Sequence, residues 1–577
     1  SMLLIYSCSE DVEVPLSSTT DAPDKSTSLE RDPFESNYKP LESERTLIKS
    51  VNLYDGLGNE YSNFDVLFDD GIIKEIGKDI VDNNATIIDA RGKWLTPGLI
   101  DIHSHMGVYP APSVRTSSDG NEATSPNTAE VWAEHSVWSQ DPQFSLALKG
   151  GVTAFHVLPG SANLFGGRGA TFKNIPRNII HEMKFPGAPH SLKMACGENP
   201  KRVYGNRGSA PSTRMGNMAG YRNAWISAVD YQKRQNEYIE KSDEAKELVD
   251  PPRRNLELDT LAGVLSGEIL VQNHCYRADE MANMIELSKE FNYKITAFHH
   301  AVEAYKIADL LADEGICGAL WADWWGFKHE AYDMVPANIA IVDQARGGQG
   351  CAIVHSDDEV GIQHLNQEAA KALSAGLRAG YEITKARAMR WITSNPAKAA
   401  GILDQTGTIE IGKDADLVIW NKNPFSVYAL TEYVFVDGAQ SLGMISIDLK
   451  NSQIDAYSMS PHKWLQAPKG TGLFYVNKNL RDIIPKMWYK SSRPEDDKTA
   501  TKYEDYSTRA WPAVVALGDA IRFHNSLGQQ RKDDHYNFLW SETKKIIDKE
   551  SRLDWLSPSN YDLGSMIMTI GIQGRSS

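Results

Sequence analysis

The chain of 577 residues has no long apolar run and no excess of positive charge. A membrane-spanning helix needs about 20 consecutive apolar residues, and because no segment approaches that length, the sequence predicts no membrane span. The formal net charge is −16, whereas binding to a phosphate backbone requires a basic surface. The sequence therefore argues against a nucleic-acid partner and favours a small molecule or short peptide.

Cysteine is scarce, and none of the cysteines has CxxC spacing. The chain holds Cys8, Cys196, Cys275, Cys317 and Cys351. This pattern predicts neither a disulfide framework nor a thiolate zinc site, so the last four are expected to be buried thiols.

Cys8 follows a short apolar run, and the segment resembles the end of a bacterial lipoprotein signal. That resemblance implies a lipid anchor at Cys8, a flexible tether from residue 9 to 42, and a location in the periplasm or cell envelope. An ordinary frayed terminus is the alternative, because the charged start of such a signal is missing and the apolar run is short.

The rest of the chain changes from strand patterns to alternating strands and helices. From about Thr46, the stretches TLIKSVNLYDG, FDVLFDDGIIKEIG and ATIIDARGKWLTPG are strand-like and close on Gly or Asp-Gly turns. Between Gly267 and about Gly380, apolar runs alternate with helical patterns, as in GEILVQNH followed by RADEMANMIELSKEF. The predicted fold class is α/β, a small β-domain with a (β/α)₈ TIM-like barrel of parallel strands.

Histidine and aspartate side chains gather where the apolar runs end. His103 and His105 close LIDIHSHMG, His274 closes ILVQNH, His299 and His300 close TAFHH, and His355, Asp357 and Asp358 follow in AIVHSDD. Catalytic groups of such barrels lie at the carboxyl ends of the strands, and alternate residues of a strand point to one face. Imidazole and carboxylate ligands suit zinc or a similar divalent ion with open positions. We therefore predict a metal site at the barrel mouth.

These motifs resemble the metal-dependent amidohydrolase superfamily, in its branch related to imidazolonepropionase and Xaa-type dipeptidases. The resemblance covers residues 46 to 436 and rests on TPGLIDIHSHMG, GGVTAF, LPGSANLFGGRG, GENPKRVYG, HHAVEAYKIADLLA, HSDDE and GTIEIGKDADLVIW. In this family, the segment after the barrel joins the N-terminal strands. The resemblance thus implies a composite β-sandwich from residues 43–96 and 405–436, interrupted by a barrel of residues 97–404, and it suggests a homo-oligomer.

The resemblance also assigns site residues by position. The implied metal ligands are His103, His105, Lys193, His274, His300 and Asp357, which would hold one or two ions, expected to be zinc. His300 is preferred to His299 because only His300 stands three residues before Glu303, as the family's His-x-x-Glu-Ala spacing requires. Asp357 is the predicted general base, taking a proton from a water whose pKa the ion lowers to about 7. His300 is the second predicted catalytic residue.

The sequence leaves alternatives for the metal ligand on the fourth barrel strand and for the residues that contact the substrate. Lys193 fits a carbamylated lysine that bridges two ions, while Glu198 is the alternative bridge and a mononuclear site is a third reading. Arg168, in the glycine-rich stretch GSANLFGGRG, is a candidate partner for a substrate carboxylate. A phosphate loop is disfavoured there because the P-loop lysine and serine are absent. Trp321, Trp324 and Trp325 follow a strand-like run and are expected to form a pocket wall, with core packing as the alternative.

A second pattern begins inside VFVDGAQSLG, residues 434 to 443. The stretch VDGAQSLGMISIDLKNSQIDAYSMSPHKWLQAPKGTGLFYV resembles the cofactor domain of class V aminotransferases, near cysteine desulfurases and isopenicillin N epimerases. The resemblance implies contacts to pyridoxal phosphate (PLP): Asp437 to the pyridinium nitrogen, Gln440 to the ring hydroxyl, His462 near the phosphate or ring, and Lys463 as the Schiff base. The preceding part of that family's fold is missing, so residues 437–577 are predicted to be a partial α/β fragment without functional PLP chemistry.

The two patterns share VDG and have no linker between them, which favours a recombination or assembly chimera over a functional fusion. We predict a metal-dependent hydrolase of amide or other C–N bonds, acting on a cyclic amide or a dipeptide-like substrate. A PLP-dependent transferase or lyase working through Lys463, and a non-catalytic ligand-binding surface lipoprotein, are the alternative functions. Residues 1–42 are assigned to the leader and tether.

Overall fold

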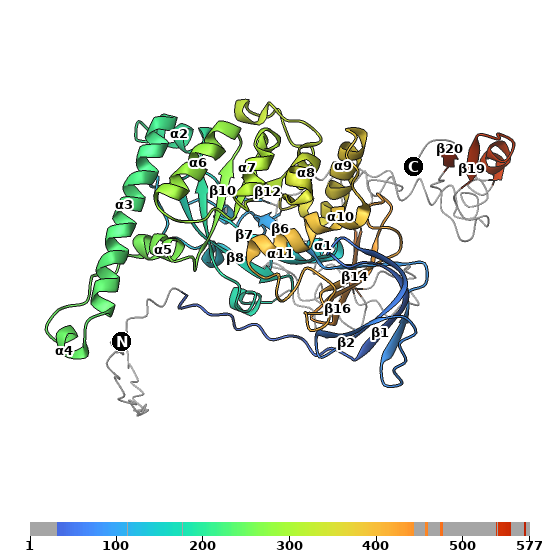
Figure 1. The fold of residues 1–577 in the computed structure, drawn as a ribbon. Helices are drawn as coiled ribbons and strands as arrows, with labels where there is room; N and C mark the ends of the chain where they lie inside the picture. The colour runs from blue at the N-terminus through green and yellow to red at the C-terminus, as the bar shows by residue number, and fades with distance from the viewer. Residues whose placement is uncertain are drawn as a thin grey trace, which may run out of the picture. The chain divides into compact units, whose positions relative to one another are not determined.

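A computed structural model of the chain describes residues 32–111, 113–175, 177–442, 456–459, 473–476, 538, 541–555 and 570–572. The chain divides into two compact units, Ser1–Met444 and Ile445–Ser577. The first unit contains a mixed β-domain and an eight-stranded barrel sheet (Figure 1). No helix in the described part of the chain combines the length and the apolar character that a membrane crossing requires.

The β-domain is built from strands on both sides of the barrel. Its strands are β1 (Thr46–Tyr54), β2 (Glu60–Asp69), β3 (Ile72–Gly77), β4 (Thr86–Asp89), β5 (Trp94–Pro97), β14 (Leu417–Trp420), β15 (Thr431–Val436) and β16 (Ala439–Leu442). They pair in the order β16-β15-β14-β5-β1-β2-β3, with β4 beside β1. Figure 1 shows the blue N-terminal strands and the orange late strands in this one domain. The composite fold that the family resemblance implies is confirmed.

The hairpin β15–β16 carries the sheet past the boundary predicted after residue 436. Val436 pairs with Ala439, so Asp437 and Gly438 form a two-residue loop in which both have positive φ, 49° and 72°. A type I′ turn requires this geometry at both central residues, and Asp-Gly is a preferred sequence for it. The first unit therefore ends at Met444 rather than at residue 436.

The barrel sheet follows the predicted alternation with one exception. Its strands are β6 (Leu99–Ser104), β7 (Val152–Val157), β8 (Phe165–Lys173), β9 (Ser191–Ala195), β10 (Leu270–Cys275), β11 (Ala297–His300), β12 (Cys317–Leu320) and β13 (Cys351–Val354), paired in chain order. Strand β8 runs antiparallel to β7 and β9, so the all-parallel prediction is wrong there. Residues 158–164 are too short for a parallel crossover, which needs at least about ten residues, but they suit a hairpin.

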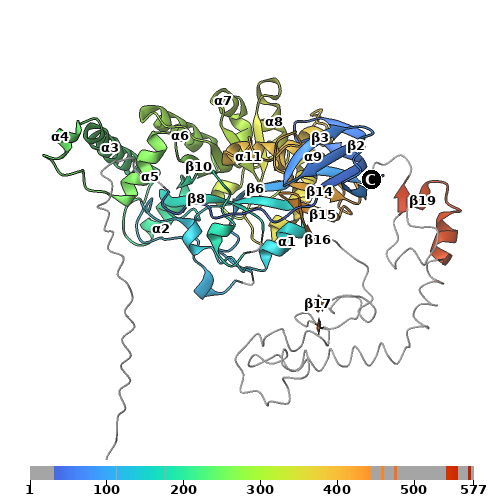
Figure 2. The same cartoon turned by 90° about the horizontal axis from the view of Figure 1, so that it is seen from below.

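Helices surround the barrel sheet (Figures 1 and 2). They are α1 (Gln143–Lys149), α2 (Glu198–Gly205), α3 (Arg214–Ile239), α4 (Asp243–Lys246), α5 (Leu256–Leu265), α6 (Ala278–Glu290), α7 (Ala308–Asp313), α8 (Asn338–Gly348), α9 (Leu365–Arg378), α10 (Lys385–Met389) and α11 (Ser394–Ala400). The side chain of Thr213 caps α3 by accepting a hydrogen bond from the Gly216 amide. Figure 2 shows α3 extending from the barrel and carrying α4 at its far end.

The four barrel cysteines form two disulfides, so the prediction of buried thiols is wrong. Cys196 follows β9 and bonds Cys275 at the end of β10, with Cα atoms 5.2 Å apart. Cys317 and Cys351 are register partners on β12 and β13, with Cα atoms 4.5 Å apart. The paired cysteines are 79 and 34 residues apart along the chain, so the sequence does not show that they are close in space. Each pair comes within bonding distance because its two cysteines lie side by side in, or directly after, neighbouring parallel strands.

Residues 32–39 contact the barrel, which corrects the predicted flexible tether over this part of residues 9–42. Lys184 donates hydrogen bonds to Asp32 and to the Phe34 carbonyl, both at 2.8 Å. The Phe34 ring meets Trp132 edge-on, with centroids 5.6 Å apart. Cys8 and the rest of residues 1–31 lie outside the described residues.

The second unit contains two described antiparallel strand pairs, β17 (Ala456–Met459) with β18 (Leu473–Val476), and β19 (Leu553–Trp555) with β20 (Ile570–Ile572). The predicted PLP residues His462 and Lys463 lie outside the described residues. The backbone of Gln440 belongs to β16 and therefore to the sheet of the first unit.

Candidate metal centre

The ends of β6 and β13 bring two histidines onto one carboxylate. The Asp357 Oδ1 atom lies 3.2 Å from His103 Nε2 and 3.1 Å from His105 Nε2. A backbone hydrogen bond of 3.0 Å from the Asp357 amide to the His103 carbonyl holds the two strand ends together. Three potential ligand atoms of these residues lie within 4.8 Å of one another. This spacing suits a divalent ion held by two imidazoles and one carboxylate.

A hydrogen bond fixes the orientation of the His105 ring so that its Nε2 atom is directed at the proposed metal position. His105 Nδ1 donates to the Leu158 carbonyl at 3.0 Å, which leaves the Nε2 lone pair facing Asp357. Metal-binding histidines commonly donate their second N–H to a carbonyl in this way. The donor set therefore fits a metal.

The orientation of His103 depends on a chain of buried contacts through His299. Gln272 Nε2 donates to the Ala399 carbonyl at 2.9 Å, so Gln272 Oε1 is the acceptor for His299 Nε2 at 2.7 Å. His299 Nδ1 must then accept from His103 Nδ1, 2.9 Å away. This leaves the His103 Nε2 lone pair directed at the metal position. His299 uses both ring nitrogens in this chain, so it positions His103.

His300 and His355 add two buried imidazoles to the same place. His300 Nδ1 has no hydrogen-bond partner among the described residues and lies 3.8 Å from Asp357 Oδ2. His103, His300 and His355 together form a second group of potential ligands within 4.8 Å. Neither ring nitrogen of His355 has a hydrogen-bond partner in the described part of the chain. The sequence placed His355 at a strand end without a role, and the structure makes it a further candidate ligand.

Two of these residues have strained backbones. His300 has φ of 67° and Asp357 has φ of 54°. Such values are uncommon outside glycine, and strain of this kind persists where the surrounding structure imposes it, often at functional sites. In both cases the strained residue follows or ends a short barrel strand, and its side chain reaches the pocket.

Lys193 occupies the fourth-strand position at the same centre. It is fully buried, and its Nζ lies 3.1 Å from His103 Nε2. Burial lowers the pKa of its ammonium group to about 7. The Glu198 carboxylate instead lies 3.9 Å from Lys328 Nζ, and it belongs to neither group of close ligand atoms. Lys193 therefore lies beside the candidate ligand His103, whereas Glu198 lies beside Lys328.

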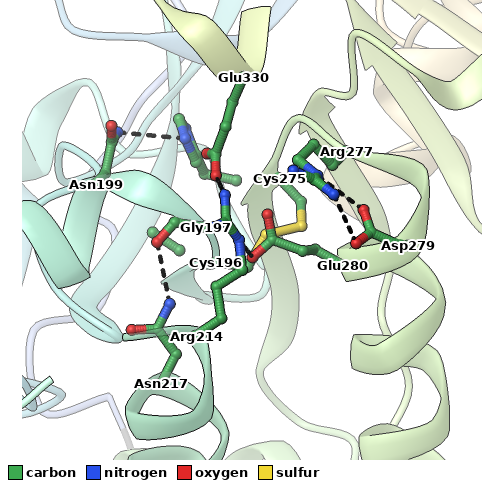
Figure 3. The surroundings of a disulfide bond; sticks show 12 residues. Cys196, Gly197, Asn199, Arg214, Asn217, Cys275, Arg277, Asp279, Glu280 and Glu330 are labelled. Carbon is green, nitrogen blue, oxygen red and sulfur yellow. Dashed lines mark hydrogen bonds and ion pairs between the residues drawn. A yellow bond between two sulfur atoms is a disulfide. The ribbon is translucent and has the colours of Figure 1, made fainter. Parts of the chain in front are cut away.

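His274 lines the same pocket but is held by two neutral side chains. Its Nδ1 lies 2.8 Å from Ser161 Oγ, and its Nε2 lies 3.3 Å from Asn199 Nδ2. Figure 3 shows Asn199 and the adjacent Cys196–Cys275 disulfide. The ring centroid of His274 is 4.6 Å from that of His300. The structure therefore brings His274 to the centre, although it lies outside the two closest ligand groups.

Burial lowers the pKa of each of these imidazoles where a shift is resolved. The pKa values of His103, His274 and His300 fall well below the usual range, and that of His355 falls to about 4, chiefly through desolvation. These four rings are therefore neutral at pH 7, which is the form that binds a metal ion.

A cavity of about 540 Å³ opens over the centre. It is lined by His105, Tyr109, Asn121, Gly160, Ser161, Asn199, His274, Tyr276, His300, Trp321, Trp324, Phe327, Lys328 and Asp357. Two of the three predicted wall tryptophans, Trp321 and Trp324, face it, whereas Trp325 does not line it. Lys328 and Tyr276 also line the cavity, although the sequence analysis assigned no role to either residue.

Arg168 does not line this cavity, so its predicted role with a substrate carboxylate is wrong. It is 2% exposed on β8, where its Nε donates to Thr260 Oγ1 at 2.7 Å. Its guanidinium lies 4.1 Å from the centroid of the Trp132 ring. Arg168 is the register partner of Leu192, whereas Lys193, which reaches the metal centre, pairs with Gly167. Because successive side chains of a strand point to opposite faces, Arg168 points away from the pocket and into the packed interior.

Asp437 also has a different place from the one that the PLP resemblance implied. Its carboxylate accepts hydrogen bonds from Lys173 and Tyr38, and its amide donates to Asp416 Oδ1 at 3.0 Å. Burial near Asp416 raises the pKa of the Asp437 carboxyl. Through Lys173, Asp437 connects the β-domain with β8, so its carboxylate is paired within the first unit.

Known amidohydrolases are similar to this chain over the barrel and its β-domain. The amidohydrolase family model matches residues 353–452. The crystal structure of an amidohydrolase from Thermotoga maritima MSB8 is 33% identical, with a TM-score of 0.63, and the alignment covers 69% of this chain and 100% of that chain. The chain belongs to the amidohydrolase family. Amidohydrolase tasK of Hapsidospora irregularis is 32% identical over 403 residues, which are 66% of this chain and 40% of tasK. This amidohydrolase thus aligns with less than half of that relative's length.

The C-terminal part matches a different family. The aminotransferase class-V model matches residues 429–577, and it overlaps the amidohydrolase match over residues 429–452. Hercynylcysteine sulfoxide lyase of Schizosaccharomyces pombe is 28% identical over 131 residues, which are 21% of this chain and 33% of that protein. The resemblance to class V aminotransferases is confirmed, and the shared VDG lies inside the overlap.

Proposed function

We propose that the barrel hydrolyses an amide or another C–N bond of a small molecule or short peptide, with zinc as the expected metal. The observation that carries this proposal is the convergence of His103 Nε2 and His105 Nε2 on Asp357 Oδ1, at 3.2 and 3.1 Å. The second nitrogens of both rings are occupied by fixed partners. Such a pre-oriented site supports metal-dependent hydrolysis and is not needed for packing alone.

The chain's own residues supply the proton transfers. A divalent ion bound here would lower the pKa of a water molecule and polarise the scissile carbonyl. The Asp357 carboxylate accepts the proton of that water and returns it to the leaving nitrogen. The Nδ1 atom of His300 has no hydrogen-bond partner among the described residues, and the Trp321 ring stacks on His300 with centroids 4.1 Å apart. His300 therefore lies where it can hold the ion or the carbonyl oxygen.

The two disulfides support an oxidising location for the protein. Disulfides of this kind persist mainly in secreted, periplasmic and cell-surface proteins, and both pairs here are buried between barrel strands. We therefore propose the periplasm or cell envelope as the location, with the lipid anchor at Cys8 as its means of attachment.

The test measures hydrolysis before and after metal removal. The purified protein is assayed against N-acyl amino acids, dipeptides and cyclic amides, as prepared, after dialysis against a chelator, and after zinc is added back. We expect cleavage of at least one class, loss of that activity on chelation, and recovery with zinc. Cleavage that survives complete metal removal would contradict the proposal. So would a reaction that needs added PLP, seen with an absorbance near about 420 nm.

A further inference from the structure

The cavity over the metal centre contains one Lys or Arg side chain, Lys328, among the described residues that line it. Lys328 Nζ donates to Asn199 Oδ1 at 3.0 Å and lies 4.3 Å from the centroid of the Tyr276 ring. The Glu198 carboxylate is 3.9 Å away, beyond hydrogen-bond distance. An ammonium group has three N–H donors, so Lys328 keeps donors for a ligand in the cavity.

Aromatic side chains connect this cation with the metal centre. The Trp321 ring stacks on His300 at 4.1 Å and continues to Trp324 at 5.8 Å and Phe327 at 5.7 Å, measured between ring centroids. Trp324 is 38% exposed and Phe327 58% exposed, although large aromatic side chains are usually well buried. We call Tyr276, Trp321, Trp324 and Phe327 the aromatic wall. It offers apolar surface from the proposed reacting groups to Lys328.

We propose that Lys328 binds a carboxylate of the substrate and that the aromatic wall binds an adjacent large apolar or aromatic side chain. The substrate class is then an N-acylated aromatic or large aliphatic amino acid, or a dipeptide with such a residue at its carboxyl end. This inference rests on the proposed hydrolytic function and narrows it. A small uncharged cyclic amide would leave both Lys328 and the aromatic wall without a contact.

Lys328 has one competing role, which the test must separate from recognition. Through Asn199 it contacts His274, because Asn199 Oδ1 accepts from Lys328 while Asn199 Nδ2 faces His274 Nε2 at 3.3 Å. If Lys328 only orients His274, its removal weakens metal binding and affects charged and uncharged ligands equally. If it binds carboxylate, its removal affects the charged ligand alone.

The probes are sulfonamides, which lack the bond that the barrel is proposed to cleave. They are N-methanesulfonyl-L-phenylalanine, the uncharged N-methanesulfonyl-L-phenylalaninol, and N-methanesulfonyl-L-alanine. Calorimetry on zinc-loaded full-length protein gives their dissociation constants, and metal content is measured on each sample. We expect the parent to prefer the phenylalanine acid over the alcohol by about tenfold or more, as for a hydrogen bond to a charged group.

Four variants show which side chains cause the preference for the acid and for the phenylalanine side chain. We expect Lys328→Met to abolish the preference for the acid without loss of metal, and Lys328→Arg to retain most of it. Trp324→Ala should reduce the preference for the phenylalanine probe over the alanine probe. Lys306→Met is the matched control, since Lys306 pairs with Asp333 at 2.6 Å and does not line the cavity.

Two outcomes would overturn the inference. In the first, the Lys328→Met protein keeps the preference for the acid, which would place the carboxylate on the metal. In the second, the Lys328→Met protein binds all three probes more weakly by the same factor and also has a lower metal content. Failure of the proposed function would look different, because the probe preferences would hold in a protein that hydrolyses nothing.

Discussion

Hydrolysis by the Asp357→Asn variant is expected to fall by about 10²–10⁴-fold, the range for loss of a general base. Asparagine keeps the shape of the side chain but cannot accept the proton of water. It also tolerates the φ of 54° at this position, because Asn is enriched among residues in the left-handed region. The fold should therefore survive, and the loss should appear in kcat measured on the best substrate of the panel.

Asp358→Asn provides the matched control for this experiment. Asp358 is the neighbouring carboxylate, but its Oδ1 accepts from the Val360 amide at 2.7 Å and so caps a turn. An asparagine can keep that contact, so we expect near-parental activity. An Asp357→Asn protein as active as the parent on any hydrolysed substrate would contradict the role of Asp357 as base.

Lys173→Met is expected to lower the free energy of unfolding of the first unit by about 3–5 kcal/mol, the cost of removing one partner from a buried ion pair. The Lys173 side chain is 2% exposed, and its Nζ lies 2.6 Å from Asp414 and 3.6 Å from Asp416 and also contacts Asp437. These carboxylates raise the pKa of the lysine despite its burial. Without the ammonium group, three acidic side chains face one another with no cation. Denaturant titration followed by tryptophan fluorescence measures the loss.

Two further variants show whether the effect comes from charge. Lys74→Met on β3 removes an exposed lysine, and we expect a change within about 0.5 kcal/mol. The double variant Lys173→Met/Asp437→Asn should recover part of the loss, because it leaves one carboxylate fewer without a partner. A Lys173→Met protein as stable as the parent would show that this cluster does not hold the β-domain to β8.

The meeting of the candidate ligands could be predicted from the sequence because each of them follows or ends an apolar run. His103, His105, His300 and Asp357 all lie at the carboxyl ends of barrel strands, and the fold brings those ends together. The choice of His300 over His299 rested on family spacing alone. In the structure both ring nitrogens of His299 contact other side chains, Gln272 and His103. The choice of His300 as a ligand stays a prediction.

The features that could not be predicted from the sequence depend on contacts between residues that are distant along the chain. The disulfide partners meet only through the register of adjacent strands. Arg168 points away from the pocket because its register partner is Leu192 and not Lys193. Lys328 reaches the cavity from a loop whose path no local pattern encodes. The sequence motif around Asp437 predicted a cofactor contact. In the structure, the Asp-Gly turn after β15 brings its carboxylate into an ion pair with Lys173.

Metal content per chain, measured on the purified parent beside a His103→Ala/His105→Ala variant, tests the central claim most directly. The account predicts one or two equivalents of zinc or a similar ion in the parent and their loss in the variant. Two equivalents would support Lys193 as a bridge, and one would support a mononuclear centre. Absence of metal from the folded parent, even after zinc is supplied, would contradict a metal-dependent function for this barrel.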